Sequence, residues 1–383
     1  MSGAPPARVV LACQDLIEAI ATFQRGIYYD MRPFVTVANP WTHLRHSCVD
    51  EKDLELTAMA FAPFHDIVSM WYTKWGHERL PKLLACLPHL RDIVVSHAVF
   101  SGNLPVLQML PAQTIQAVRY PLLDLAALTG RMDILDYLHA VVRHNGCTIW
   151  AIDKAAHYGH IDVVRYLHER RTEGCSAWAI MAAAKYGHLD VVKFLHAHLA
   201  HPCLKWALEH AAGANHVDIV GYIIESLGKD QVYGANAMNK AAHHGHVAML
   251  ELLDSHGLQC TTDAMDFAAC CGHLDVVQWL HSNHDGGCTT LAMDEAARNG
   301  HLDVVRWLHT HRQEGCTKQA IHHSIMNKHW DVVRYLITHQ LEGNGRDALD
   351  LAMHDPNAPS DVVALLRDKG APVGVSTIVP ELA

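Results

Sequence analysis

The sequence predicts an all-α solenoid built from short helical repeats that stack on one another. Three observations predict it: a segment recurs every 27 to 30 residues, apolar residues fall at helical spacing within each copy, and a turn residue, usually glycine, divides each copy. With 383 residues, the chain is longer than the roughly 250 to 300 residues at which single cores usually split. A repeat array avoids that limit because each copy packs only on its neighbours.

The recurring segment is most regular in four copies. They read AIDKAAHYGHIDVVRYLH (151–168), AIMAAAKYGHLDVVKFLH (179–196), AMDFAACCGHLDVVQWLH (264–281) and AMDEAARNGHLDVVRWLH (292–309). A tenth, degenerate copy lies around Asp361. The turn residues of the other nine copies are Gly102, Gly130, Gly159, Gly187, Asn215, Gly245, Gly272, Gly300 and Lys328.

The first helix of each copy is expected to pack closely on its neighbours. Its small and aliphatic residues, as in AIDKAA at 151–156, fall on one helical face. The glycine that follows fits a left-handed helix cap, a conformation that glycine adopts most cheaply and asparagine next. Lys328 is expected to cost about 1 kcal/mol if it keeps this geometry.

The second helix follows the turn residue and begins with His, an aliphatic residue, Asp, Val and Val. The Asp lies in the first turn, where it complements the helix dipole. An aromatic residue comes next in most copies, which predicts a ladder of buried rings. Ser or Thr in the turn between copies is expected to cap the next first helix. The aromatic residues are Tyr137, Tyr166, Phe194, Tyr222, Trp279, Trp307 and Tyr335, and the caps are Thr148, Ser176, Thr289 and Thr317.

Composition points to a protein partner inside the cell. The formal charge of −10 has the wrong sign for holding nucleic acid or an anionic membrane. We find no apolar run near the roughly 20 residues that cross a bilayer, and the first residues lack a signal-peptide pattern. We therefore expect a cytoplasmic or nuclear monomer, with no membrane or nucleic-acid partner. Its 11 cysteines are expected to stay reduced.

The motif AA, two free residues, GHLDVV and a final Leu resembles the core of the ankyrin repeat over about residues 90–372. The family's usual period is about 33 residues, and the missing residues fall where ankyrin proteins carry a hairpin finger, so we expect shortened fingers. Trp150-Ala151-Ile152-Asp153 replaces the family's Thr-Pro-Leu-His. The resemblance implies protein recognition through a concave face lined by the first helices. Shortened units of about 28 residues resemble expanded ankyrin families of some microbial eukaryotes and large DNA viruses.

The predicted organisation has three parts. Residues 91–372 form the array of about ten units, and residues 373–383 form a disordered tail. Residues 1–90 lack the period and are interpreted as a helical N-terminal segment that caps the array, with a helix from about Val10 to Phe23. Residues 58–72 faintly resemble a repeat that has lost its glycine and gained Pro63.

An alternative reading of the N-terminal segment is an adaptor. Asp15-Leu16-Ile17, followed by Ile20 and Phe23, resembles an F-box segment. The F-box family usually carries Leu-Pro where Ala12-Cys13 stands. This resemblance implies a substrate-recognition adaptor of a ubiquitin ligase.

The many histidines and cysteines recur at the repeat period, which favours structural roles. Copies one interhelical spacing apart, roughly 8 to 10 Å, cannot share one metal ion or form disulfides. Asp residues at the histidine position of the Thr-Pro-Leu-His box, such as Asp153, are interpreted as local hydrogen-bonding groups. Nucleophile-elbow, phosphate-loop and metalloprotease motifs are missing from the sequence. We expect no enzymatic activity, no metal and no cofactor.

Candidate binding residues lie just before the turn residue and about one helical turn earlier, where the copies differ. Aromatic residues and arginine are common interface anchors, so Tyr158, Tyr186 and Arg298 lead the candidates. The full set is Lys154, His157, Tyr158, Lys185, Tyr186, His243, His244, Arg298 and Asn299.

Overall fold

The described part of the chain is helical. A computed structural model describes residues 28–37, 53–141, 146–199, 203–227, 235–339 and 345–370. Within those ranges the regular structure is helix without strand, which confirms the all-α prediction. The chain divides into unit 1, Met1–Ala183 with Lys193–Leu199, and unit 2, Ala184–Val192 with Ala200–Ala383. Each unit is described by itself.

Ten helix pairs follow one another within the described residues. The first helices are α5 (Arg91–Ser101), α8 (Leu122–Leu128), α10 (Trp150–His157), α12 (Trp178–Lys185), α14 (Leu204–Gly213), α16 (Ala235–His243), α18 (Thr262–Cys270), α20 (Thr290–Arg298), α22 (Lys318–Met326) and α24 (Gly345–His354). The second helices are α6 (Leu104–Met109), α9 (Met132–Asp136) continued by η5 (Tyr137–Val141), α11 (Ile161–Arg170), α13 (Leu189–His198), α15 (Val217–Leu227), α17 (Val247–Ser255), α19 (Leu274–Asn283), α21 (Leu302–His311), α23 (Trp330–Thr338) and α25 (Ser360–Gly370). Helix α7 (Ala112–Gln116) lies between the first two pairs.

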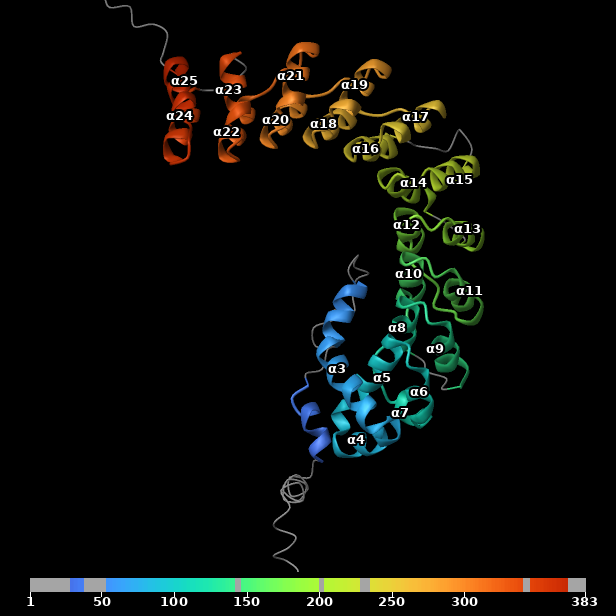
Figure 1. The fold of residues 1–383 in the computed structure, drawn as a ribbon. Coiled ribbons are helices and arrows are strands. Elements are labelled where there is room, and N and C mark those ends of the chain that lie inside the picture. The colour runs from blue at the N-terminus through green and yellow to red at the C-terminus, as the bar shows by residue number, and fades with distance from the viewer. Residues whose placement is uncertain are drawn as a thin grey trace, which may run out of the picture. The chain divides into compact units, whose positions relative to one another are not determined.

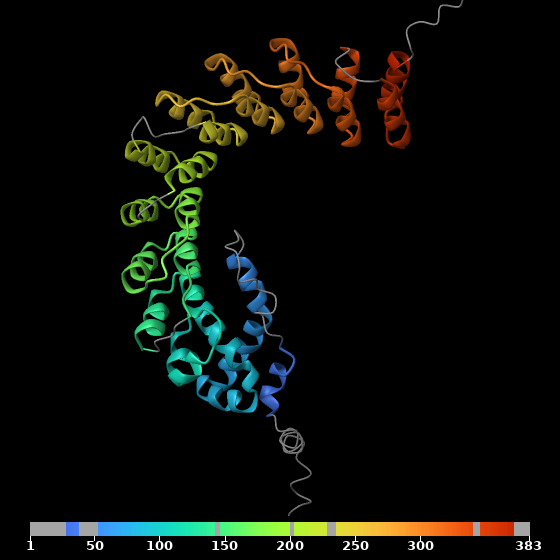
Figure 2. The same ribbon diagram turned by 180° about the vertical axis from the view of Figure 1, so that it is seen from behind.

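Neighbouring copies pack first helix on first helix and second helix on second helix. In unit 2, helices α14 to α24 form one continuous row, and α17 to α25 form the other. Figures 1 and 2 show these two rows from opposite sides. The paired alanines of the first helices, such as Ala268 and Ala269, are fully buried, as are Val276 and Val277 of the second helix. Small side chains therefore permit the close approach that the repeat pattern predicts.

The turn between the two helices of a copy has the predicted left-handed geometry. Gly159 has φ +73°, and its N–H donates to the carbonyl of Ala156 while the N–H of His160 donates to that of Ala155. This pair of bonds satisfies the last carbonyls of the first helix. Asn215 and Lys328 keep the same conformation, with φ of 64° and 65°. The turn is therefore retained where glycine is absent.

The histidine that follows most turn residues restricts the glycine of the preceding copy in a second way. A Cβ built on Gly272 would lie 2.5 Å from Nδ1 of His301, which belongs to the next copy. The same relation joins Gly300 to His329, at 2.5 Å. The glycine thus supplies both a positive φ and room for an imidazole of its neighbour. The same steric relation also joins Gly130 to His160, Gly187 to His216 and Gly245 to His273.

We expect Lys328→Gly to raise the free energy of unfolding by up to about 1 kcal/mol, because glycine adopts this φ without Cβ strain. The substitution also removes an exposed 3.4 Å ion pair between Lys328 Nζ and Asp355, which contributes little. Urea unfolding would measure the change. The matched variant Asn215→Gly is expected to gain less because asparagine tolerates this conformation better. A clear loss of stability in Lys328→Gly would contradict the strain argument.

The N-terminal segment is helical where the structure describes it. It contains η1 (Tyr29–Phe34), α3 (Asp53–Trp75), η3 (His77–Arg79), α4 (Leu80–Cys86) and η4 (Pro88–Leu90). Helix α3 runs unbroken through Pro63, so the faint likeness of residues 58–72 to a helix pair is wrong. Phe34 meets the edge of Trp71 at 5.8 Å, and Arg79 binds Asp30 at 2.6 Å. These contacts hold η1 on α3 and η3.

Some predictions about the chain ends are not tested by the structure. The predicted helix at Val10–Phe23, the F-box-like residues and the tail at 373–383 lie outside the described residues. Among the described residues, no single helix is long and apolar enough to cross a membrane. One pair bent by 120°, His77–Cys86 with Pro88–Ser101, passes the test on length and composition alone.

Candidate protein-binding surface

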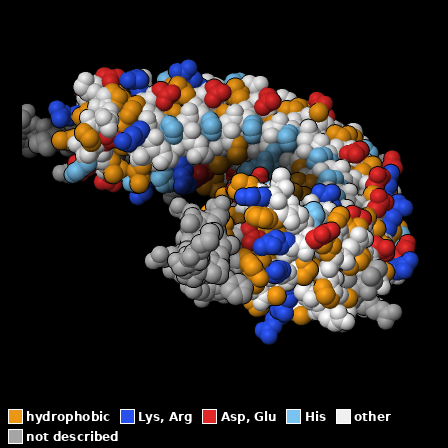
Figure 3. All heavy atoms as spheres, turned by 60° about the horizontal axis from the view of Figure 1, so that its bottom comes forward, with side chains coloured by type: hydrophobic (Ala, Val, Ile, Leu, Met, Phe, Trp, Pro, Cys, Tyr) orange, Lys and Arg blue, Asp and Glu red, His pale blue; other side chains and the backbone are white. Residues whose placement is uncertain are grey.

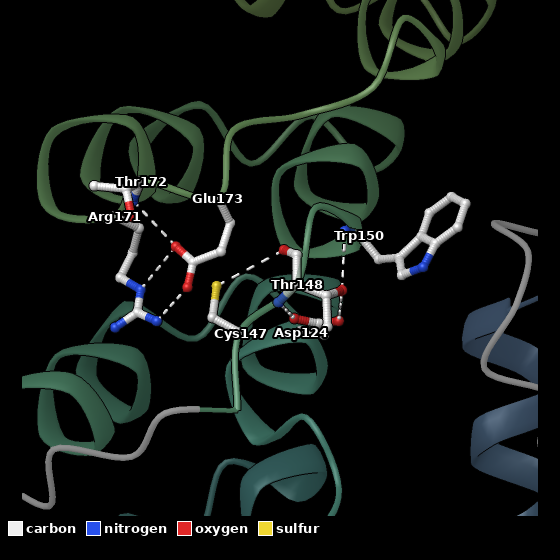
Figure 4. Close-up of polar contacts among 7 residues, drawn as sticks. All are labelled: Asp124, Cys147, Thr148, Trp150, Arg171, Thr172 and Glu173. Carbon is white, nitrogen blue, oxygen red and sulfur yellow. Dashed lines mark hydrogen bonds and ion pairs between the residues drawn. The ribbon is translucent and has the colours of Figure 1, made fainter.

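Buried carboxylates join four of the first helices to the turn before the next one. Asp124 accepts hydrogen bonds from the backbone N–H of Thr148 at 2.8 Å and from its hydroxyl at 2.5 Å. The same Thr148 oxygen accepts from the N–H of Trp150, so one Thr caps its own helix and bonds to its neighbour (Figure 4). The arrangement recurs in the pairs Asp153–Ser176, Asp266–Thr289 and Asp294–Thr317. This confirms the predicted hydrogen-bonding role of these carboxylates.

Burial shifts the proton equilibria of these groups. It raises the pKa of Asp153 to about 6, against the lowering effect of the two bonds from Ser176. Burial likewise raises the pKa of Asp124 and of Asp266. In the copy of α16, Asn239 takes this place and donates from Nδ2 to Thr261 Oγ1 at 2.8 Å. In this copy an uncharged amide therefore takes the place of the carboxylate.

The cysteines in the turns between copies are partly or fully buried. Burial raises the pKa of Cys147 to about 12 and that of Cys288 to about 11, so both thiols stay protonated at neutral pH. Beside Cys147, Arg171 forms an ion pair with Glu173 (Figure 4). An equivalent pair, Arg312–Glu314, lies near Cys288. Their protonation fits the small apolar role predicted for them.

The aromatic ladder of the second helices differs from the prediction of buried core rings. Its rings are half-buried, and several of them contact histidines. Trp307 stacks on His311 at 4.5 Å and meets the edge of His281 from the preceding copy at 5.1 Å. Tyr335 repeats this arrangement with His339 and His309. The predicted burial is therefore only partial, whereas the predicted contacts between successive copies are present.

The other histidine row follows the turn residue. Its His216 donates from Nε2 to the carbonyl of Lys185 at 3.0 Å, and His246 donates to that of Gly213 at 3.1 Å. Figure 3 shows histidine side chains in a row along one side of unit 2. Within the described residues no group of three or more His, Cys, Asp or Glu is arranged to hold a metal ion. These imidazoles join neighbouring turns.

One face of the first helices carries the residues that vary between copies. It comprises the positions nine, five, two and one residue before the turn residue, which lie on one side of a helix. We call these positions the first-helix face. In unit 2 it includes Lys185, Tyr186, Trp206, His210, Lys240, His243, His244, Phe267, Cys270, Cys271, Leu291, Glu295, Arg298, Asn299, His323, Met326 and Asn327.

In unit 1 the candidates on this face are engaged by the chain itself. His157 is 3% exposed and stacks on Trp178 with ring centroids 5.3 Å apart. The hydroxyl of Tyr158 accepts a 3.1 Å hydrogen bond from the backbone N–H of Leu54 in the first turn of α3. Lys154 is half-buried. Tyr158 is therefore tied to a segment about 100 residues earlier in the chain.

Lys185 and Tyr186 begin the face in unit 2. The ammonium of Lys185 lies 5.4 Å from the ring centroid of Tyr186. The hydroxyl oxygen of Tyr186 is buried. Lys185 therefore provides a positive charge on the first-helix face, whereas Tyr186 contributes mainly to packing.

His243 and His244 lie close together at the end of α16. Their ring centroids are 4.7 Å apart, and His243 also meets the ring of Phe267 at 5.8 Å. Burial, together with the charge of Lys240, lowers the pKa of both histidines, so they are neutral at pH 7. The structure thus brings two predicted residues together with an aromatic residue of the next copy.

Arg298 and Asn299 have different roles. Arg298 is exposed and forms a 3.3 Å ion pair with Glu295 on its own helix. Asn299 donates to the carbonyl of Cys270 at 2.8 Å, and Asn327 donates to that of Arg298 at 2.8 Å. The asparagines therefore join successive copies. Arg298 alone projects a charge from this pair.

Sequence reasoning missed the two exposed aromatic side chains of this face, which also exposes Leu291 and Met326. Trp206 is 50% exposed on α14 and Phe267 is 44% exposed on α18. Equivalent positions in unit 1 hold residues that pack inside the chain, such as Trp178 against His157. In the sequence, these side chains appear only as large apolar residues nine or five places before the turn residue. A large apolar residue at such a position fits a buried side chain as well as an exposed one.

A cavity of about 560 Å³ opens between α22 and α24. Lys318, His322 and His323 line one side of it, and Asp347 and Asp350 line the other. Both signs of charge meet there, so the cavity selects neither an anionic nor a cationic ligand.

A comparison with protein families agrees with the repeat architecture. The family described as ankyrin repeats (3 copies) matches residues 154–233 and 293–377. Among solved structures, the human ASB11 ankyrin repeat domain is 19% identical, with a TM-score of 0.38. That alignment covers 51% of this chain and 99% of the ASB11 domain chain. A comparison with curated proteins finds no match.

Proposed function

Because the chain is an ankyrin repeat protein, we propose that it binds another protein through the first-helix face of unit 2. Ankyrin repeats are generally protein-interaction modules. One observation carries the proposal for this face: it exposes large apolar and cationic side chains on helices whose other positions are mostly buried. Trp206 and Phe267 are about half exposed among Lys240, His243 and His244.

The same face in unit 1 is less suited to a partner. Helix α3 bonds to Tyr158 there, and His157 is covered by Trp178. We therefore propose a scaffold that recognises its partner with the later copies and performs no catalysis itself. Trp206 and Phe267 replace Tyr158 and Tyr186, which led the candidates, as the proposed anchors. Truncating either tyrosine would also disturb packing within the chain.

The test is the double variant Trp206→Ala/Phe267→Ala. A partner would first be captured on the wild-type chain by crosslinking and identified by mass spectrometry. Its dissociation constant is then expected to rise about thirty-fold in the variant, the effect of losing about 2 kcal/mol at a binding hot spot. The free energy of unfolding should change by only about 1 kcal/mol because both side chains are half exposed.

A matched control lies on the second helices. Val217 of α15, a second helix of unit 2, is 49% exposed, so Val217→Ala should leave binding unchanged. Unaltered affinity in the double variant would exclude the first-helix face. An equal loss in Val217→Ala would place the binding surface on the second helices.

A further inference from the structure

In unit 1 the first-helix face already carries a helix, which belongs to the chain itself. His97 and Phe100 lie five and two residues before Gly102, so they occupy face positions of α5. Phe61 of α3 stacks on Phe100 at 5.5 Å and meets His97 edge-on at 5.9 Å. Phe64 meets the same His97 ring at 5.1 Å. Aromatic residues of α3 are therefore seated on this face.

Helix α3 extends from this contact towards a later copy. Its first turn reaches Tyr158, which lies one residue before Gly159 and two copies after α5. Figures 1 and 2 both show α3 running beside the first helices of unit 1. A helix of 23 residues is about 35 Å long, which exceeds two interhelical spacings of about 10 Å. The face thus accepts an α-helix that crosses several copies.

The buried apolar residues of α3 follow a helical period; Phe61 and Phe64 contact α5, and Trp71 contacts Phe34 of η1. Phe61, Phe64, Val68 and Trp71 are spaced at i, i+3, i+7 and i+10, and each is at most 5% exposed. The sequence of residues 53–75 holds three acidic residues, Asp53, Glu55 and Asp66, against one basic residue, Lys74. This occupant is an amphipathic helix with a net negative charge.

Unit 2 presents an imidazole and an aromatic ring at the same two kinds of face position, in the opposite order. His243 and Phe267 lie two and five residues before their turn residues, and their rings meet edge-on at 5.8 Å. This contact lies within the face itself, whereas in unit 1 the ring that meets His97 edge-on is Phe61 of α3. The buried Nδ1 of His243 has no hydrogen-bond partner among the described residues. The aromatic part of the face is therefore present in unit 2 without a helix such as α3 seated on it in the described structure.

Charge around these rings favours an acidic occupant. Burial and the charges of Lys240 and Lys185 lower the pKa of His210, and Lys240 also contributes to the lowered pKa of His243 and of His244. The acidic residues beside them are Glu209, which accepts a hydrogen bond from Asn236 at 3.1 Å, and Asp263, exposed at the start of α18. The two lysines flank the exposed rings and would attract acidic side chains.

We infer that the partner presents an acidic amphipathic α-helix, which lies across α14, α16 and α18 as α3 lies across the first helices of unit 1. Large apolar side chains of that helix contact Trp206 and Phe267. Its acidic side chains lie near Lys185 and Lys240. The inference rests on the proposed function, since it names the kind of element that the same face binds.

The test uses a fluorescein-labelled peptide with the sequence of residues 53–75 as the acidic helix, added to the full-length chain. Fluorescence anisotropy is expected to show saturable binding. Lys240→Glu should weaken it about ten-fold by reversing a flanking charge, whereas Lys318→Glu on α22 should not. A control peptide has Asp53, Glu55 and Asp66 replaced by lysine. Its affinity for the wild type should be no higher than the affinity of the acidic peptide for Lys240→Glu.

Two outcomes would overturn the inference: no saturable binding, or binding of the acidic peptide that Lys240→Glu leaves unchanged. The second would mean that the peptide exchanges with α3 in unit 1 instead. If the captured partner still depends on Trp206 and Phe267 while the peptide fails to bind, the binding face stands and the helical ligand is wrong. If both fail, the proposed face is wrong as well.

Discussion

Gly272→Ala is expected to lower the free energy of unfolding by about 3 kcal/mol. Two costs combine. An alanine at φ +78° bears the left-handed strain of roughly 1 to 2 kcal/mol. Its Cβ would also lie 2.5 Å from Nδ1 of His301, so the imidazole of the next copy must move, at a typical overpacking cost of 1 to 3 kcal/mol. Urea unfolding followed by circular dichroism measures the total.

Two further variants separate these costs. Gly257 has φ +80° but nothing within 4 Å of its Cβ position, so Gly257→Ala should lose only the strain, about 1 kcal/mol. Adding His301→Ala to Gly272→Ala removes the clashing ring, and the double variant should lose less than the sum of the two single variants. Equal losses at Gly272 and Gly257, or strictly additive effects, would show that the histidine does not press on the glycine.

The repeat itself could be predicted from sequence because its physical causes are local. A left-handed turn requires glycine or tolerates asparagine, and the structure retains that turn even at Lys328. Paired alanines at helical spacing indicate helices in close contact, and Ala268 and Ala269 are fully buried. Asp153 bonds to Ser176 in the next turn, within the span of one copy. Glycine and histidine also recur at fixed positions in the sequence, but only the structure shows that the imidazole of one copy lies against the glycine of the preceding copy.

The state of the candidate site could not be predicted, because it depends on neighbours that the period does not encode. Tyr158 looked like a binding residue, yet its hydroxyl bonds to Leu54, far away in the chain. Tryptophans at one repeat position have different surroundings: Trp178 covers His157, whereas Trp206 is half exposed. The repeat pattern in the sequence predicts which residues share a face. Whether a face is covered depends on segments such as α3 that follow no period.

Asp153→Ala is expected to lower the free energy of unfolding at pH 7 by about 2 to 3 kcal/mol. The carboxylate accepts from both the N–H and the hydroxyl of Ser176, at 2.9 and 2.5 Å. Alanine leaves that partly buried N–H without its acceptor and frees the hydroxyl that caps α12 at Trp178. Thermal and urea unfolding of the variant would measure the loss.

Asp153→Asn is the informative counterpart because Asn239 fills the same role naturally, with bonds of 2.8 and 3.3 Å to Thr261. It should fold with nearly wild-type stability at pH 7 while removing one titrating group. Burial raises the folded-state pKa of Asp153 to about 6, above its unfolded value of about 3.9. Its contribution is therefore fully present below pH 4 and is lost as the pH rises through 6.

The stability of the wild type relative to Asp153→Asn should thus fall by up to about 3 kcal/mol between pH 4 and pH 7, since each pKa unit corresponds to about 1.4 kcal/mol. Unfolding curves of both proteins across this range give that difference directly. A pH-independent difference, or one that grows as the pH rises, would mean that the carboxylate is not destabilised by burial. The repeat would then accept a charge at this position as readily as an amide.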